Sequence, residues 1–360
     1  MSLSALRWPP FVSPTLGRHL AMALGAAVFL LLVSSQIGAY DDYNLAAIAL
    51  FAIATAGLTV LTGVNGQLSL GHGALMAIGA YTTSLLLRGR ELPLMLVLLA
   101  SVTTAALIGA VFGVAAARLR GPYLAGATLA LALGLPQIPT RYKGVFGGEE
   151  GLTVSLPAPP NWLGVDFPRE RWLAWIAIAA ALATMVLLAN VLQSSVGRRF
   201  KAVRDHEAAA ALCGIDVAQT QVQAFVLSSG CAGLAGSLFA YWSGVTAPGG
   251  FSIPLSLQLL SAVVIGGLGT LAGAVWGSIV LVLLPTFTGG MASNLNLPSS
   301  VGNNLPLAIY GAVLVLAMLV FPYGIHGGLG RLLGLVRARW GQTSTNHKGV
   351  VDWDDPAPGG

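Results

Sequence analysis

Residues 44–87 read NLAAIALFAIATAGLTVLTGVNGQLSLGHGALMAIGAYTTSLLL, which is two apolar runs separated by a short polar stretch. The whole segment contains no Asp, Glu, Lys or Arg. A helix that crosses a bilayer needs about 20 mostly apolar residues, and each run comes close to that length. The segment therefore predicts two transmembrane helices with a polar break between them.

The rest of the 360-residue chain has the same character. Hydrophobic residues make up 55% of it and charged residues only 9%, whereas an average globular chain has about 25% charged residues. The mean hydropathy is +0.78. Because so few charges cannot cover a water-facing surface, the composition predicts an all-α polytopic membrane protein. It excludes a soluble enzyme, a disordered chain and a disulfide scaffold.

Apolar runs of suitable length recur along the chain, and the last part of the series allows two interpretations. The segment 254–288 fits either two thin spans or one span with a broken or re-entrant piece, so we expect nine to ten transmembrane helices. The first run follows basic residues as a signal peptide would, but nine runs follow it, so we interpret it as an uncleaved span. A cleaved signal peptide is the alternative. The runs are 20–38, 44–62, 69–87, 94–117, 122–138, 172–193, 218–242, 254–267, 270–288 and 304–321.

The distribution of Lys and Arg predicts the orientation. With ten crossings and a cytoplasmic N-terminus, the inner connections hold about twice as many of these residues as the outer ones, as the positive-inside rule requires. Both termini are then cytoplasmic. The predicted regions are a cytoplasmic N-terminus (1–19), a transmembrane domain (20–321) with an outside loop (139–171) and a cytoplasmic loop (194–217), and a cytoplasmic, partly disordered tail (322–360).

The apolar runs contain nothing that could couple transport to an ion gradient through a charged group. None of them holds Asp, Glu, Lys or Arg, and the chain has no Gly-x-x-x-x-Gly-Lys-Ser/Thr phosphate loop. Paired carboxylates, metal-ligand spacings and nucleophile constellations are also missing from the pattern, so we expect no catalytic residues, no metal and no cofactor. Basic residues flank the apolar runs, so we expect them to contact membrane lipid and expect no binding of nucleic acid. The chain is either a passive channel or is driven by another polypeptide.

The cytoplasmic loop favours the second interpretation, in which another polypeptide drives transport. Residues 204–215 read RDHEAAAALCGI, which predicts a short helix over 207–212 that is closed by a glycine. A small Ala face would enter a cleft on an ATPase, with charged residues forming ion pairs at its rim. An ordinary amphipathic connector on the bilayer surface is the alternative. The candidate coupling residues are Arg204, Glu207, Ala208, Ala209 and Gly214.

Four segments of the chain are similar, in order, to motifs of one transporter family. Residues 57–74, 120–125, 207–215 and 264–273 resemble LivM-type permease subunits of branched-chain amino-acid ABC importers. The segment 147–152 departs from the family pattern, and this places the substrate in doubt, because related permeases import urea and short amides.

The resemblance implies a permease subunit of an ATP-binding-cassette importer that forms half of the pore for branched-chain or related amino acids. It implies a second related permease, two ATPase subunits that use the ATP, and an extracytoplasmic solute-binding protein. The location would be the plasma (inner) membrane of a bacterial cell. A facilitative channel, or an ABC permease for urea or short amides, is the alternative function.

The polar break between the second and third runs is the candidate translocation path. Non-helical backbone at membrane depth persists only where protein or a water-filled cavity satisfies it. We expect Ser69 to cap the third helix and the helix start to face a carboxylate. The alternative is a cytoplasmic hairpin whose polar groups cap helix ends. The candidate path residues are Asn65, Gln67, Ser69 and His72.

Glycines recur at four-residue spacing in two places, Gly109 with Gly113 and Gly269 with Gly273 and Gly277. Such stripes let helix backbones approach each other closely in a membrane. They predict either packing inside the subunit or contact with a second permease.

Overall fold

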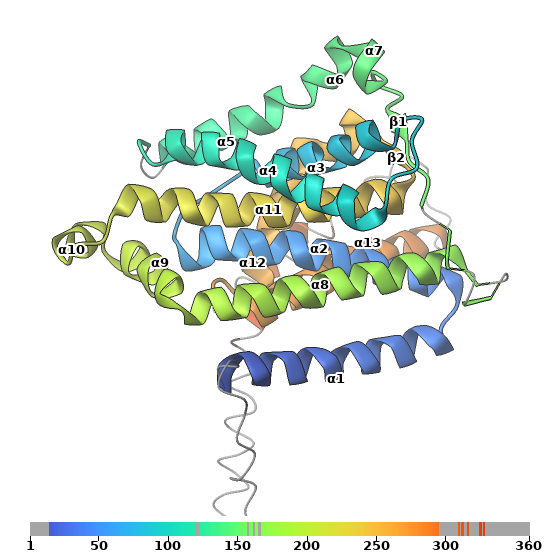
Figure 1. The fold of residues 1–360 in the computed structure, drawn as a ribbon, viewed down its shortest axis with the longest axis horizontal. Coiled ribbons are helices and arrows are strands. Elements are labelled where there is room, and N and C mark those ends of the chain that lie inside the picture. The colour runs from blue at the N-terminus through green and yellow to red at the C-terminus, as the bar shows by residue number, and fades with distance from the viewer. Residues whose placement is uncertain are drawn as a thin grey trace, which may run out of the picture.

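A computed structural model describes residues 14–294, except 120–121, 157, 161–162 and 165–166, and a few isolated positions between 309 and 327. The described part is a bundle of long helices that run side by side along one axis (Figure 1). Its regular structure is helical except for two strands of two residues each. The all-α membrane class that the sequence predicts is confirmed.

The helices follow the apolar runs. The predicted runs up to residue 288 each coincide with one helix, although the first helix begins earlier than expected and the fifth ends before Pro136. The run 304–321 and the tail after it lie outside the described residues, apart from isolated positions. The helices are α1 (Pro14–Gln36), α2 (Ala39–Leu58), α3 (His72–Leu87), α4 (Leu94–Ala116), α5 (Pro122–Gly134), α8 (Arg169–Gln193), α11 (Val217–Ser243), α12 (Ile253–Gly266) and α13 (Leu271–Asn294).

Six helices in the described part are long and apolar enough to cross a membrane. They are α1, α2 with its continuation to Val64, α4, α8, α11, and α12 with the turn before it. α3 and the segment Leu271–Phe287 of α13 are shorter apolar helices. The chain is therefore a multi-pass membrane protein, whereas the count of nine to ten crossings stays a prediction.

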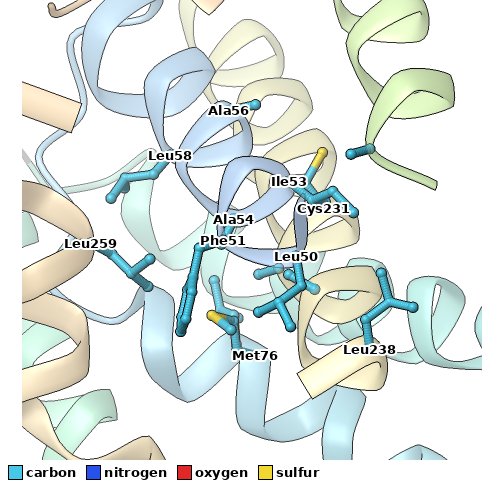
Figure 2. Close-up of a cluster of buried hydrophobic side chains, with 14 of the residues drawn as sticks. Leu50, Phe51, Ile53, Ala54, Ala56, Leu58, Met76, Cys231, Leu238 and Leu259 are labelled. Atoms are coloured by element: carbon cyan, nitrogen blue, oxygen red, sulfur yellow. The ribbon is translucent and has the colours of Figure 1, made fainter. Parts of the chain in front are cut away.

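α11 is the central helix and packs against α2, α3 and α4. The side chain of Asp216 accepts a hydrogen bond from the backbone N–H of Gln219 at 2.9 Å and so caps the N-terminus of α11. Between α2, α3 and α11, the buried side chains of Leu50, Met76 and Leu238 form part of the core (Figure 2).

α1 lies at the side of the bundle, against α8 (Figure 1). The ring of His19 is hydrogen-bonded to the side chain of Asn190, and the indole N–H of Trp175 donates to Ser34. These contacts make α1 antiparallel to α8, so the beginning of α1 lies at the same end of the bundle as the loop that follows α8.

The two polar loops lie at opposite ends of the bundle (Figure 1). The loop 194–217 contains α9 (Ser195–Asp205) and α10 (Glu207–Leu212). At the other end are α6 (Gln137–Arg141), α7 (Lys143–Phe146), β1 (Leu152–Thr153) and β2 (Val245–Thr246), with β1 and β2 paired antiparallel. We expected a loop over 139–171, and the structure adds short helices and a strand there.

The segment 254–288 forms two helices, α12 and α13, joined by a turn at Gly267–Thr270. α12 is only 14 residues long and follows a short 3-10 helix, η4 (Pro248–Phe251). Pro254 is in the first turn of α12, where its missing N–H removes no intrahelical hydrogen bond.

Candidate functional site

The loop 194–217 is folded onto the bundle through α9. The hydroxyl of Ser194 accepts a hydrogen bond from the backbone N–H of Val196 at 3.2 Å and caps α9. One face of α9 buries Phe200 and Val203, and the helix contacts α8, α11 and the end of α2. The apolar face of this loop therefore packs on protein.

α10 spans Glu207–Leu212, as the sequence predicts. The ring of His206 accepts a hydrogen bond from the backbone N–H of Ala209 at 3.2 Å and caps the helix. Gly214 has φ +80°, a conformation that favours glycine, and it follows the helix end. Both ends of this short helix are thus specified by local sequence.

α10 presents small and apolar side chains to its surroundings. Ala208 and Ala209 are exposed, and the Leu212 side chain is 90% exposed, the largest value among the exposed large hydrophobic residues of the described chain. Leu212 therefore leaves its apolar surface uncovered at the tip of α10.

The two charged residues that we expected at the rim of a partner are bonded within the chain. The Gln221 amide donates to Glu207 Oε1 at 3.1 Å, which ties α10 to α11. Arg204 donates through Nε and Nη2 to Asp205 Oδ1 at 2.9 and 2.8 Å, and through Nη1 to the carbonyl of Gly63 at 3.1 Å.

Gly63 belongs to the segment that leads into the polar break. α2 continues as a π-helix, η2 (Thr59–Val64), and the chain is then irregular until α3 begins at His72. The cap of α3 is Gly71, so the prediction that Ser69 caps this helix is wrong. A Cβ at Gly71 would lie 2.7 Å from the carbonyl oxygen of Thr128, which leaves no space for a capping side chain.

The break returns into the bundle. Gly63 lies against Gly269, just beyond the end of α12, whereas Gly73 lies against Ser256 in the first turn of α12, about 15 Å of helix away at 1.5 Å per residue. Residues 65–71 therefore run back along α12. As a result α3 begins inside the bundle, whereas a hairpin at the surface would require it to begin at the end of the bundle that carries the loop 194–217.

The part of the break next to α3 is bonded to α5 and α12. The backbone N–H of Leu70 donates to the Thr128 hydroxyl, and that of Gly73 donates to the Ser256 hydroxyl, each at 3.0 Å. The N–H of Gly73, in the first turn of α3, is therefore already bonded within the chain, although we expected the start of this helix to face a carboxylate.

Buried polar atoms without a hydrogen-bond partner concentrate along residues 59–72. Of eleven such side-chain atoms in the described part of the chain, six belong to Thr59, Asn65, Gln67 and His72. Buried polar groups in proteins are nearly always hydrogen-bonded. Water or a polar solute would supply the bonds that these groups lack.

A cleft of about 570 Å³ lies between residues 65–68 of the break and the loop 194–217. Asn65 and Gln67 line it from the break, and Arg204, Glu207 and Ala208 line it from the loop. The structure therefore brings three of the five candidate coupling residues next to two of the four candidate path residues, whereas Ala209 and Gly214 do not line this cleft. Ser69 and His72 are buried elsewhere, toward α5, α12 and α2.

Residues 41–320 match the family of permease components of branched-chain amino acid transport systems. This chain belongs to that family. The permease is 27% identical to the high-affinity branched-chain amino acid transport system permease protein LivM of Salmonella typhimurium, over 77% of this chain and 67% of that protein. The likeness confirms the resemblance to LivM-type permeases.

Two further relatives are more distant or shorter matches. The permease is 26% identical to LivH of Escherichia coli, a permease protein of the same-named transport system, over 77% of this chain and 91% of that protein. It is 36% identical to the autoinducer 2 import system permease protein LsrC of Klebsiella pneumoniae over 50% of this chain and 52% of that protein. No solved structure matches it.

The first glycine pair of the permease lies where α4 crosses α11. A Cβ at Gly109 would collide with the side chain of Ser229, and a Cβ at Gly113 would lie 3.1 Å from the Cβ of Phe225. Both glycines therefore face another helix of the same chain.

The second glycine stripe lies around the turn between α12 and α13. A Cβ at Gly273 would lie 2.6 Å from the carbonyl oxygen of Gly267, and a Cβ at Gly277 would collide with the carbonyl of Ala262. Gly269 lies against Gly63. These three glycines are likewise in contact with the permease itself.

Three residues of this site were not predicted from the sequence: Asp205, Leu212 and Gln221. Leu212 is the one apolar side chain larger than Ala in α10, which is a visible signal. Asp205 orients its neighbour Arg204, and Gln221 lies one helix away from Glu207, so no local spacing reveals either contact. Among the residues that the structure describes, no group of three His, Cys, Asp or Glu side chains could hold a metal ion.

Proposed function

We propose that the permease is a subunit of an ATP-binding-cassette importer and forms half of the pore for branched-chain or related amino acids. The match of residues 41–320 to permease components of branched-chain amino acid transport systems carries this proposal. A hydrogen bond from Arg204 to Gly63, beside the shared cleft, fits it. This bond connects a loop with an exposed apolar tip to the segment that holds most of the unpaired buried polar atoms.

The energy comes from partner subunits. The sequence holds no phosphate-binding loop of the Gly-x-x-x-x-Gly-Lys-Ser/Thr kind, so two ATPase subunits bind and hydrolyse the ATP and dock on α10 at the cytoplasmic side. A second, related permease completes the pore, and an extracytoplasmic solute-binding protein delivers the substrate. The relatives LivM and LivH, two permease proteins of one named system in Escherichia coli, support a two-permease arrangement.

The polar break forms part of the path. An amino acid carries an ammonium and a carboxylate, which need hydrogen bonds throughout a crossing. Asn65, Gln67 and His72 offer donors and acceptors that are buried and unpaired in this structure. They contact the solute when the pore opens, and Ser69 completes the polar wall between them.

Substitution of Leu212 tests the docking of the ATPase. We expect Leu212→Asp to prevent co-purification of the ATPase subunits and to lower substrate-stimulated ATP hydrolysis about tenfold or more, because a charge replaces an apolar anchor. Val245→Asp is the control. It makes the same apolar-to-acid change at an exposed position of β2, at the opposite end of the bundle, and should leave co-purification unchanged. Normal co-purification and hydrolysis with Leu212→Asp would remove α10 as the docking site.

Uptake by the purified permease alone in vesicles, down the substrate gradient, would favour the facilitative channel.

A further inference from the structure

Three parts of the permease meet at Gly63. A Cβ at this position would collide with the backbone nitrogen of Gly269 and would lie 2.8 Å from its Cα. Gly269 has φ +83° and lies in the turn between α12 and α13. The last turn of η2 and this turn are therefore in direct backbone contact, with no side chain between them to absorb a displacement.

Arg204 attaches the third part, α9, to the same point. Its Nη1 donates to the carbonyl of Gly63, while its Nε and Nη2 are held by Asp205. The stem of the side chain lies on Gly66, where a Cβ would be 2.9 Å from Arg204 Cγ. Arg204 thus contacts the chain on both sides of Asn65, the first residue of the break.

The guanidinium of Arg204 holds two partners at once. The group is planar and carries five N–H donors in fixed directions. Two of its nitrogens donate to Asp205, which is also on α9, and the third donates to Gly63. A cation at the last carbonyls of a helix is also favoured by the helix dipole.

The helix that receives this contact is suited to a change of register. η2 is a π-helix of six residues, and π-helices are rare, short and frequent at functional sites. Six residues of loosened helix followed by seven residues of irregular chain can shift without unwinding a regular α-helix.

We propose that Arg204 is a positioning residue that transmits movement of the loop 194–217 to the polar break through the carbonyl of Gly63. The proposal rests on the function proposed above, since it assumes that an ATPase moves this loop. Loss of the contact leaves ATPase docking on α10 intact but removes the link between ATP hydrolysis and the path. Arg204 then acts inside the permease, in place of the rim ion pair that the sequence suggested.

The test measures ATP hydrolysis and substrate uptake on the same preparation of the complete transporter in lipid vesicles. For Arg204→Ala we expect co-purification of the ATPase and a hydrolysis rate within about twofold of the unmodified complex, with uptake lower by about tenfold or more, the effect of about 1.4 kcal/mol. Arg204→Lys should recover part of the uptake, since an ammonium can reach one of the two partners but cannot bridge both. Asp205→Ala should lower the uptake per ATP less than Arg204→Ala does.

Lys201→Ala is the matched control, because Lys201 is an exposed cation one turn earlier on α9. It should leave both rates unchanged. A parallel fall of hydrolysis and uptake in Arg204→Ala, or no fall in either, would overturn the proposal. The melting temperature of each complex shows whether a variant is misfolded, and Arg204→Lys then decides the outcome. Failure of the proposed function gives a different result, since the ATPase subunits would then co-purify normally with Leu212→Asp.

Discussion

Asp42 on α2 forms an ion pair with Arg171 on α8, with Arg171 Nε 3.0 Å from Asp42 Oδ2. The Asp42 side chain is fully buried, and its second oxygen accepts a hydrogen bond from Ser34 of α1. Arg171 also donates through Nη2 to the carbonyl of Ile37. One carboxylate therefore joins three long helices, α1, α2 and α8.

Removal of this carboxylate should destabilise the permease. Asp42→Ala leaves Arg171 without its ion-pair partner, and loss of one partner of a buried pair costs about 3 to 5 kcal/mol. We expect the lower end of this range, because the Arg171 side chain is 22% exposed. Asp41→Ala is the control, since Asp41 is an exposed acid in the same first helical turn. Thermal unfolding in detergent measures the difference, and equal melting temperatures for the two variants would contradict the prediction.

Gly277→Ala should destabilise the permease itself and not only its assembly. The added Cβ would collide with the carbonyl of Ala262, and overpacking of this kind costs about 1 to 3 kcal/mol. Gly25→Ala is the control, because a Cβ at Gly25 meets nothing within 4 Å. The measurement is the melting temperature of the isolated subunit. If Gly277→Ala leaves this temperature unchanged but blocks association with a second permease, the glycine stripe is an interface.

Asn65→Leu should lower uptake without lowering stability. Both polar atoms of the Asn65 amide are buried and unpaired, and an unsatisfied buried polar group costs about 1 to 3 kcal/mol. A leucine of similar size removes that cost, so the melting temperature should stay equal or rise. If the amide contacts the solute, uptake falls about tenfold, which corresponds to one lost hydrogen bond to a charged group.

Trp172→Phe is the control for this experiment. The indole N–H of Trp172 is also buried and unpaired, but it lies on α8, away from the break. Its removal should leave uptake unchanged. An Asn65→Leu variant with unchanged rate and affinity for uptake would show that Asn65 is not part of the path.

The long helices and the short helix α10 of the loop 194–217 were predictable because each depends on local sequence. An apolar run needs no partner to be recognised, and α10 follows from four consecutive alanines between Glu207 and a glycine at position 214. The regions at the two ends of the bundle also follow from the order of the runs, since each crossing reverses the direction of the chain.

The position and the bonds of the break were not predictable in the same way. Ser69 fits the usual preference for a helix cap, but the cap is Gly71, which lies against the backbone of Thr128, and the helix starts at His72. The contact between Arg204 and Gly63 joins residues that are far apart in the sequence. No rule of spacing reveals such a pair, because it depends on how α9 is placed against η2.

The contact between Gly63 and Gly269 has a consequence for biosynthesis. The two residues are separated by more than half of the chain, and a chain leaves the ribosome from its N-terminus. While the last helices are still being made, η2 has no backbone neighbour at this point, so an unfinished permease lacks the three-way junction. The order of synthesis therefore delays this junction until the turn between α12 and α13 has been made.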